Sequence, residues 1–357
     1  MKTALIAMSG GVDSSVAALL MKEKGYDCMG TTLKLFNNDD TGVIKRDNTC
    51  CSLDDIEDAR SVAFDLDIPY YVFNFTSNFK EEVMERFVCA YESGFTPNPC
   101  IDCNRYIKFE HLYDKAKELG IQYVVTGHYA RVEYDEDLNR YILKKGLDEK
   151  KDQSYVLYSL TQEQLAHTKF PVGELTKDEV RELAEKSGFI NAAKKDSQDI
   201  CFVLDGDYAK FIENYRNKKY DSGDFVDSKG NVLGEHDGII KYTIGQRKGL
   251  GISSERPLYV TKKDMKKNKV VLGHDEDLFS SELVARNINL ITIDSIEEPL
   301  RLKAKIRYNQ VEQWATVTQL NDDEIKVVFD EPQRAIAKGQ AVVLYDGDTV
   351  VGGGTII

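Results

Sequence analysis

The sequence predicts an α/β fold in three parts: a Rossmann-like domain with a parallel sheet, a small central linking domain and a C-terminal β-barrel. Over residues 1–201, short β-rich runs alternate with longer amphipathic stretches, which is typical of a parallel sheet with covering helices. Over residues 202–277 this alternation stops, and Gly, Asp and Lys surround short apolar runs. Over residues 278–357, short runs of alternating apolar and polar residues predict strands that close into a small barrel.

The first part contains four predicted strands and five predicted helices. The strands cover residues 4–8, 28–35, 70–75 and 122–125. Four of the helices cover residues 14–24, 53–66, 78–93 and 109–119. A fifth begins after Thr176, because Thr176 and Glu179 have the spacing of a capping box. In the last part, the strands cover residues 300–308, 314–320, 324–329, 340–345 and 349–351.

The net charge of −13 argues mildly against a nucleic-acid partner, because phosphate binding normally leaves a basic footprint. Two local patches run against that overall balance. One is a lysine-rich stretch over residues 262–269, which taken alone is more often a solvated turn. In the other, Arg301, Lys303, Lys305 and Arg307 alternate with apolar residues, so a strand over residues 300–308 would present four cations on one face.

The sequence predicts a cytoplasmic protein without membrane contact. Its first eight residues are too short for the apolar core of a signal peptide and run directly into glycines. No apolar stretch is long enough to cross a bilayer. In the cytoplasm the seven cysteines would be reduced, so paired cysteines indicate redox, metal or catalytic chemistry rather than structural disulfides.

A glycine loop joins the first predicted strand to the first predicted helix, and residues 9–15 read Ser-Gly-Gly-Val-Asp-Ser-Ser. Two glycines let backbone amides approach an anion, and the helix N-terminus adds N–H groups and a favourable dipole. The carboxylate of Asp13 would act through a magnesium ion or hold the loop. The Lys-Ser/Thr ending of a Walker loop is missing. The alternative interpretation is a tight strand-to-helix turn that binds no ligand.

Three cysteines stand in polar or proline-containing surroundings. Cys100 and Cys103 form a Cys-x-x-Cys pair within residues 96–105, where two prolines predict a stiff loop that is not helical. Such a pair is a redox couple, half of a zinc site or part of an iron–sulfur site. Cys201 follows a polar run over residues 195–199.

The other four cysteines have plainer interpretations. Cys28 and Cys89 fall in apolar patterns and are predicted core residues. Cys50 and Cys51 are adjacent in the loop after the second predicted strand. For these two, a zinc site shared with Cys100 and Cys103 is the functional alternative, and the sequence does not assign their role.

Together, the glycine loop and the cysteine segments resemble the tRNA-specific 2-thiouridylases, a family of PP-loop ATP pyrophosphatases. The resemblance covers almost the whole chain and extends to residues 126–130, 151–155, 170–175 and 244–251. It implies ATP-dependent 2-thiolation of the wobble uridine of tRNA. In that reaction the C2 oxygen of uracil is adenylated and sulfur then replaces it. The resemblance also implies that ATP and Mg²⁺ are cofactors and that tRNA is a partner. A cysteine desulfurase or sulfur-relay protein would donate persulfide or sulfide.

The resemblance assigns roles to individual residues of this chain. Cys103 matches the catalytic cysteine and Cys201 the cysteine that carries persulfide, and a disulfide between them would need reduction after each cycle. The implied ATP-binding residues are Ala7, Met8, Ser9, Gly10, Gly11, Val12, Asp13, Ser14, Leu33 and Gly127. The implied contacts to the target base or the rest of the tRNA are Asn98, Pro99, Cys100, His128, Lys151, Asp152, Gln153, Arg307, Tyr308 and Gln340. His128 would be a general base or a positioning residue.

One departure from the family leaves the sulfur route open. Many members have Asp where this chain has Cys100, so Cys100, Cys103 and Cys201 offer three thiolates, enough to hold a 4Fe-4S cluster with one open iron. Two other functions also compete. Another PP-loop adenylating ligase or amidotransferase would leave Cys103 and Cys201 without a role. A non-catalytic iron–sulfur or RNA-binding protein would leave the glycine loop without one.

Overall fold

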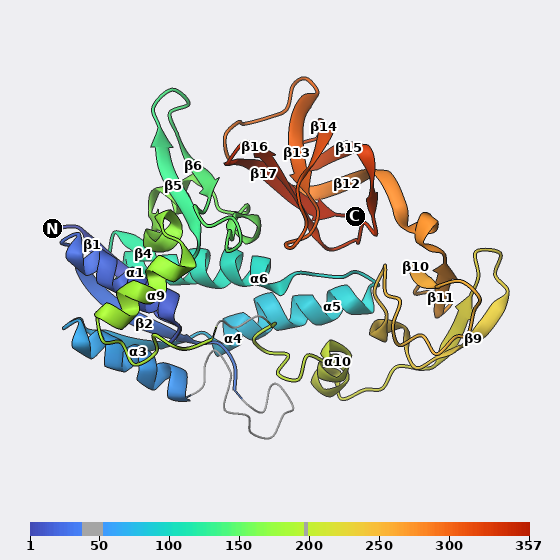
Figure 1. Cartoon of the computed structure of the whole chain (residues 1–357), viewed down its shortest axis with the longest axis horizontal. Helices are drawn as coiled ribbons and strands as arrows, with labels where there is room; N and C mark the ends of the chain where they lie inside the picture. Colours follow the sequence, from blue (N-terminus) through green and yellow to red (C-terminus); the bar gives the residue numbers. More distant parts are fainter. Residues whose placement is uncertain (38–52, 196–198) are drawn as a thin grey trace.

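The structure confirms the predicted α/β architecture, in which a parallel sheet leads through a central part to a β-barrel (Figure 1). The computed structural model describes residues 1–37, 53–195 and 199–357. The first sheet has the order β3-β2-β1-β4-β7, and its neighbouring strands are all parallel. Its strands are β1 (Thr3–Ala7), β2 (Asp27–Lys34), β3 (Tyr70–Asn74), β4 (Tyr123–Val125) and β7 (Thr168–Lys169). The four predicted strands are confirmed, and β7 adds an edge that the sequence did not predict.

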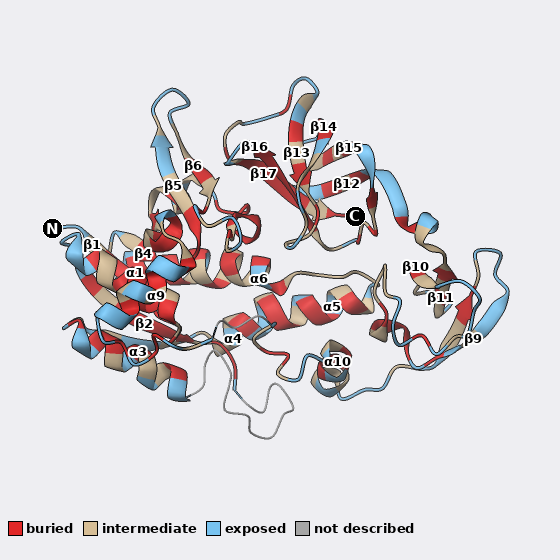
Figure 2. Ribbon diagram, viewed as in Figure 1, coloured by how far each residue is buried: buried red, intermediate tan, exposed pale blue. Residues whose placement is uncertain are grey.

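Helices cover both faces of this sheet. Alternate residues of the central strand β1 point to opposite faces, and since these residues are apolar, both faces must be buried. Ala4 and Ile6 belong to a core with three helices on one face, namely α1 (Val12–Glu23), α3 (Leu53–Asp65) and α9 (Lys177–Lys186). Leu5 belongs to the core on the other face, with two longer helices. The buried positions of α9 form one side of that helix, whereas α1 is buried on nearly all sides over residues 14–18 (Figure 2).

The two longer helices each contain a wider π-helical stretch. The first comprises α4 (Thr76–Phe79), η1 (Lys80–Glu85) and α5 (Arg86–Glu92) and matches the helix predicted over residues 78–93. The second comprises α6 (Pro99–Asp102), η2 (Cys103–His111) and α7 (Leu112–Glu118), so it begins well before the predicted start at residue 109. The two helices lie side by side and lead from the sheet towards the centre of the molecule (Figure 1).

The central part contains a helix and a four-stranded sheet of its own. The helix is α10 (Tyr208–Arg216), and the sheet has the order β10-β11-β8-β9. Its strands are β8 (Gly223–Val226), β9 (Val232–His236), β10 (Tyr259–Asp264) and β11 (Lys269–Gly273). Arg216 at the end of α10 forms ion pairs with Glu85 and Glu92 of the first long helix at 2.7 and 3.0 Å, which ties the central part to the first part.

The last part is a closed antiparallel barrel of six strands, because β12 pairs with both β15 and β17. The strands are β12 (Phe279–Leu290), β13 (Leu300–Lys305), β14 (Gln313–Asn321), β15 (Glu324–Arg334), β16 (Ala341–Asp346) and β17 (Thr349–Ile356). A hairpin from the first part, β5 (Ala130–Asp135) and β6 (Arg140–Lys145), continues this sheet by pairing with β17. The sequence did not predict that hairpin.

Short helical turns complete the fold. They are η3 (Ser154–Val156), α8 (Gln162–Ala166), η4 (Pro171–Glu174), η5 (Ile239–Lys241) and η6 (Asp275–Leu278). The predicted capping box at the start of α9 is present, since Thr176 and Glu179 exchange hydrogen bonds. Across the described residues, no helix combines the length and the apolar character that a membrane crossing requires.

Candidate active site

The glycine loop turns sharply between β1 and α1. The backbone of Gly10 has a φ of +74°, and a Cβ atom there would lie 2.3 Å from the carbonyl oxygen of Asp55, so this position needs glycine. The Ser14 hydroxyl accepts a hydrogen bond from the Ser9 N–H at 3.2 Å and donates one to the Gly11 carbonyl at 2.9 Å. Gly11 is the N-cap of α1 and supplies no side-chain cap. The loop therefore has the backbone arrangement that binds anions at helix starts.

The remaining residues predicted to bind ATP lie beside this loop. Ala7 ends β1, and the N–H of Met8 donates to the Thr31 carbonyl of β2 at 2.8 Å. Val12 is the buried first residue of α1, and Leu33 is nine-tenths buried in β2. Ala7, Met8 and Leu33 lie at or next to the carboxyl ends of the neighbouring parallel strands β1 and β2, which is where open α/β sheets bind ligands.

The Asp13 carboxylate is held by two side chains that the sequence did not single out. The buried ammonium of Lys177 pairs with it at 2.7 and 2.9 Å, and the Tyr129 hydroxyl donates to it at 2.7 Å. Lys177 is the first residue of α9, directly after the capping residue Thr176, so the capping box was the available signal for its position. Gly127 also touches the loop, because a Cβ there would come 2.7 Å from the backbone of Asp13.

His128 lies in an apolar enclosure beside the loop. Its ring contacts the rings of Phe109 and Phe170, and its Nδ1 shares a 2.6 Å hydrogen bond with the Thr126 hydroxyl. Burial lowers the pKa of His128 well below its usual value, so the ring is neutral. This environment favours a positioning role for His128 over that of a general base.

The Cys-x-x-Cys segment is helical, and the loop predicted for it is wrong. Pro99 occupies the first position of α6, where its missing N–H costs nothing, and Asn98 caps the helix by accepting from the Cys100 N–H at 3.1 Å. Cys100 is exposed, whereas Cys103 at the start of η2 is half-buried. The prolines therefore begin a helix here instead of preventing one.

Asp102 lies between the two cysteines on the same helix. Burial raises its pKa to about 6, although Arg86 and Arg105 act in the opposite direction. The Arg86 Nε lies 3.8 Å from the carboxylate, which is too far for a strong hydrogen bond. The sequence contained this carboxylic acid but no signal that it would be buried.

Cys103 and Cys201 pack against the same core, which also includes Leu5 of β1 and Leu33 of β2. Both are half-buried thiols in the structure. Within the described residues, no group of three or more His, Cys, Asp or Glu side chains is arranged to hold a metal ion. Cys100, Cys103 and Cys201 as arranged therefore do not fit a 4Fe-4S cluster.

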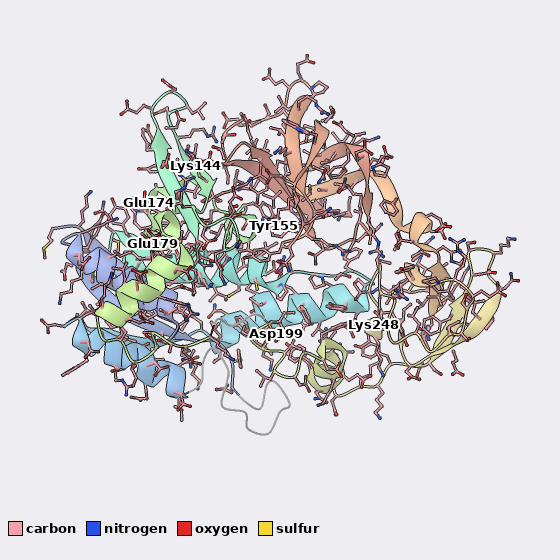
Figure 3. All side chains as sticks on the ribbon, viewed as in Figure 1. Lys144, Tyr155, Glu174, Glu179, Asp199 and Lys248 are labelled. Carbon is pink, nitrogen blue, oxygen red and sulfur yellow. The ribbon has the colours of Figure 1, made fainter. Side chains whose placement is uncertain are left out.

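The barrel contacts the segment that leads into α6, the helix that carries Cys100. The Gln340 side chain donates to the Thr96 carbonyl at 2.7 Å, two residues before Asn98. Tyr308 packs edge-on against Tyr155, which Figure 3 shows beside the barrel. The pKa of Tyr308 rises to about 12 through burial and the nearby charges of Asp152 and Cys100. Tyr308, Gln340 and Cys100, all predicted site residues, thus lie where the barrel meets the segment over residues 96–100, which we call the junction.

Arg307 follows the end of β13 and is not part of the strand. Its guanidinium donates to the Ala335 carbonyl at 2.6 Å. Burial and the neighbouring charge of Arg334 lower its pKa. Two cations are therefore close together, and Asp275 compensates one of them, because its carboxylate lies 2.9 Å from the Arg334 Nε.

The rest of the predicted cationic face is largely neutralised. Arg301 forms a two-pronged ion pair with Asp330 at 2.8 and 2.7 Å, and Lys303 lies 3.6 Å from Glu312. Lys305 is half-buried, between the rings of Tyr155 and Tyr308. The predicted alternation of buried and outward residues in β13 is correct, but its outward cations already have local partners.

Residues 151–153 divide into two structural residues and one half-exposed lysine. Asp152 is buried and accepts hydrogen bonds from both the N–H and the hydroxyl of Ser154. Gln153 accepts from the Tyr129 N–H at 3.0 Å, which links it to the residue that holds Asp13. Lys151 and Gln153 are both half-exposed, whereas Asp152 is buried.

The two cysteines predicted as core residues differ. Cys28 is buried, as predicted, and burial raises its pKa to about 11. The prediction for Cys89 is wrong, because Cys89 is exposed beside the Glu85–Arg216 ion pair. Cys50 and Cys51 lie outside the described residues.

Comparison with known proteins assigns the family. Residues 2–205 match the domain described as the tRNA methyl transferase HUP domain. Residues 209–274 match the tRNA methyl transferase PRC-barrel domain, and residues 280–356 the Aminomethyltransferase beta-barrel domain. A tRNA-specific 2-thiouridylase MnmA of Clostridioides difficile is 54% identical over 99% of this chain and 98% of its own length. This chain belongs to the tRNA-specific 2-thiouridylase family.

A second relative has the same extent as the first, whereas the solved structures align with a smaller share of this chain. A second family member, from Acetivibrio thermocellus, is 52% identical over 99% of both chains. Among solved structures, an NMN synthetase from Francisella tularensis aligns with 61% of this chain and 78% of its own chain, at 19% identity and a TM-score of 0.33. The family assignment therefore depends on the full-length relatives.

Proposed function

We propose that this protein is an ATP-dependent tRNA sulfurtransferase that replaces the C2 oxygen of the wobble uridine by sulfur. The observation that carries the proposal is that Cys103 and Cys201, far apart in sequence, both pack against the core that contains Leu5 of β1, the strand that leads into the glycine loop. The names of the full-length relatives, tRNA-specific 2-thiouridylases, support the same reaction.

The chemistry takes place in two stages. The uracil C2 oxygen attacks the α-phosphorus of ATP, forming the O2-adenylate and releasing pyrophosphate. The terminal sulfur of a persulfide on Cys201 then attacks C2, AMP leaves, and the uridine is joined to Cys201 through a disulfide. The Cys103 thiolate attacks the Cys201 sulfur, which forms the Cys103–Cys201 disulfide and releases 2-thiouridine. An external dithiol reduces the protein disulfide before the next cycle.

The chain's own groups have separate parts in this scheme. The loop and the N-terminus of α1 bind the phosphates, and Asp13 holds the loop through Lys177. We expect Mg²⁺ to enter with ATP, and we expect a cysteine desulfurase or sulfur-relay protein to recharge Cys201. A cytoplasmic location stays a prediction of the sequence. No step is assigned to an iron–sulfur cluster, because the described thiols do not fit one.

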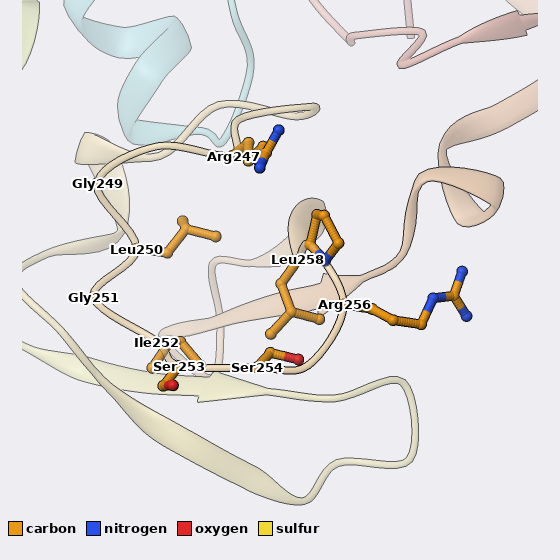
Figure 4. A pocket seen from close by; sticks show the side chains of 10 residues that line it. Arg247, Gly249, Leu250, Gly251, Ile252, Ser253, Ser254, Arg256 and Leu258 are labelled. Atoms are coloured by element: carbon orange, nitrogen blue, oxygen red, sulfur yellow. The ribbon is translucent and has the colours of Figure 1, made fainter.

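We expect tRNA to bind along the junction and onto the central part. Residues 241–269 contain nine Lys or Arg and two Asp or Glu, in a chain whose net charge is −13. The loop over residues 247–258 surrounds a cavity of about 410 Å³ with exposed Arg247 at its edge (Figure 4). This loop continues the junction, since a Cβ at Gly245 would come 2.9 Å from the Ala335 side chain. A polyanion on Arg307 could therefore extend to Arg247.

The decisive experiment compares cysteine variants in two assays. In Cys103→Ser and Cys201→Ser, 2-thiouridine formation in tRNA should fall by at least about 10³-fold. A single equivalent of tRNA-dependent pyrophosphate release should remain, because the phosphate loop is unchanged. The matched control is Cys89→Ser, which alters an exposed cysteine and should leave both assays unchanged. Multiple-turnover thiolation by Cys201→Ser would contradict the proposal.

Cys100→Asp separates the persulfide route from the cluster route. With persulfide chemistry this variant keeps substantial activity, and anaerobically purified wild-type protein thiolates tRNA without iron. Parallel loss of iron and thiolation in Cys100→Asp would overturn the persulfide route. Pyrophosphate release that depends on a small carboxylate instead of tRNA would favour the adenylating ligase.

A further inference from the structure

The segment that follows α9 forms hydrogen bonds with the glycine loop and the start of α1. The Asn191 amide donates to the Gly10 carbonyl at 3.0 Å and to the Ser15 hydroxyl at 2.9 Å. The Lys194 ammonium donates to the same Gly10 carbonyl at 3.1 Å. A carbonyl oxygen has two lone pairs, so these two donors use its whole hydrogen-bonding capacity.

Fixing that carbonyl also fixes the next N–H group. The Gly10 carbonyl and the Gly11 N–H belong to one peptide unit, which is planar and trans, so the two groups point in opposite directions. Because Asn191 and Lys194 hold the carbonyl on one side, the Gly11 N–H points to the other, at the N-cap of α1. Gly10 is also the residue at which this peptide could turn most easily, since glycine accepts a wide range of backbone angles.

Lys194 is placed to orient the loop, and its charge is already compensated. Its Nζ lies 2.6 Å from a carboxylate oxygen of Asp55 and 2.6 Å from one of Asp58, both on α3. Burial lowers the pKa of Lys194, but the two carboxylates outweigh it, so the pKa is raised and the side chain stays charged. An ammonium has three N–H donors, and these three acceptors account for them. A direct phosphate contact would require Lys194 to leave this arrangement.

Asn191 is buried with one unpaired oxygen, and its two donor contacts offset the free-energy cost of burying that oxygen. Only 3% of the residue is exposed, and within the described residues its Oδ1 has no hydrogen-bond partner. Rotating the amide by half a turn would place that oxygen against the Gly10 carbonyl, so the orientation is determined. Burial of an unsatisfied oxygen is unfavourable, which indicates that donation to Gly10 and Ser15 outweighs it.

We propose that Asn191 and Lys194 are positioning residues of the phosphate loop, which hold the Gly10 carbonyl so that the Gly11 N–H faces the ATP phosphates. Neither side chain touches the nucleotide in this proposal. It rests on the proposed function, in which ATP is the ligand of the loop. It predicts that variants of these two residues change KM for ATP without changing KM for tRNA.

The test measures KM for ATP and KM for tRNA in the pyrophosphate-release assay. Lys194→Met and Asn191→Asp should each raise KM for ATP by about tenfold, the effect of one misdirected charge-assisted hydrogen bond, and leave KM for tRNA unchanged. Lys194→Arg, which keeps a donor at this place, should recover part of the loss. The matched control is Asp58→Asn, which weakens the ion pair of Lys194 but leaves its contact with Gly10, and its KM for ATP should stay near that of wild type.

The outcomes separate this proposal from the proposed function. If wild type releases no tRNA-dependent pyrophosphate, the proposed function fails. If wild type is active but both Lys194→Met and Asn191→Asp keep its KM for ATP, the positioning proposal is overturned. An equal rise in Asp58→Asn would also overturn it, because the effect would then come from the ion pair alone. Should Lys194→Met fail to fold, Asn191→Asp carries the test, since it is similar in shape to the native residue.

Discussion

Asp102 illustrates how a single residue acquires a property that its type does not reveal. It lies between Cys100 and Cys103, and burial raises its pKa to about 6 despite Arg86 and Arg105. His128 is a second case, since burial between Phe109 and Phe170 keeps its ring neutral. Both residues are titratable groups beside the site whose charge depends on enclosure by distant parts of the chain.

The buried state of Asp102 predicts a pH dependence of stability. Its folded pKa of about 6 lies above the unfolded value of about 4, so folding favours the protonated form. The stabilising contribution is present below pH 4 and is lost as the pH rises through 6. Asp102→Asn imitates the protonated form. At pH 7.5 its free energy of unfolding should therefore exceed that of wild type by roughly 1–2 kcal/mol, and it should unfold at a higher urea concentration. The difference should shrink at pH 5.

Urea titrations at pH 5 and pH 7.5 check this, with Asp65→Asn on the exposed end of α3 as the control. The same stability difference at both pH values would contradict the assignment.

At the scale of secondary-structure elements, three separate segments hold the glycine loop. α9 contributes Lys177, the turn over residues 126–128 packs against the start of α1, and the segment over residues 191–194 holds Gly10. Each contact comes from a different element, and each reaches the loop from a different place in the sequence. The loop is therefore preorganised by its surroundings, which reduces the cost of binding phosphate.

Gly127 tests that preorganisation. A Cβ at this position would come 2.7 Å from backbone atoms of Asp13 and Ser14, which cannot move aside without moving the loop. Gly127→Ala should therefore raise KM for ATP by about tenfold or more. Binding of tRNA in the absence of ATP, measured by filter retention, should stay unchanged and serves as the control for folding. A variant with wild-type KM for ATP would show that the loop tolerates displacement.

At the scale of the whole molecule, the barrel contacts the segment before α6, and the central part contacts the other long helix of the first part. Gln340 of the barrel reaches Thr96, and Arg216 of α10 forms ion pairs with the first long helix. Both contacts join a later part of the chain to the first part. A substrate bound at the cysteines would contact the barrel and could reach the basic residues of the central part.

The salt dependence of tRNA binding checks this path. Replacing Arg247 and Arg307 together by Gln should weaken binding and reduce the slope of log K against log salt by one to two units, roughly one for each lost phosphate contact. Replacing Arg301 and Lys303 should change the slope little, because Asp330 and Glu312 already pair with them. If replacing Arg301 and Lys303 reduced the slope and replacing Arg247 and Arg307 did not, tRNA would bind to the cationic face of β13 instead.

The sequence by itself determined the features that depend on local pattern. Alternation of β-rich and amphipathic runs predicted the parallel sheet, and the glycine loop and the cysteines indicated the family that the full-length relatives confirm. The strand pattern of residues 300–308 predicted which side chains of β13 are buried. These features can be read locally because periodicity records which face of an element is apolar.

Only the tertiary structure decided which residues meet. It brought Lys177, Asn191 and Lys194 to the glycine loop, added the β5–β6 hairpin to the barrel sheet and started a helix at Pro99. It also neutralised the cations of β13 and exposed Cys89. Periodicity does not name the partner of a buried face or of a charge, because that partner is chosen by packing between segments far apart in the chain.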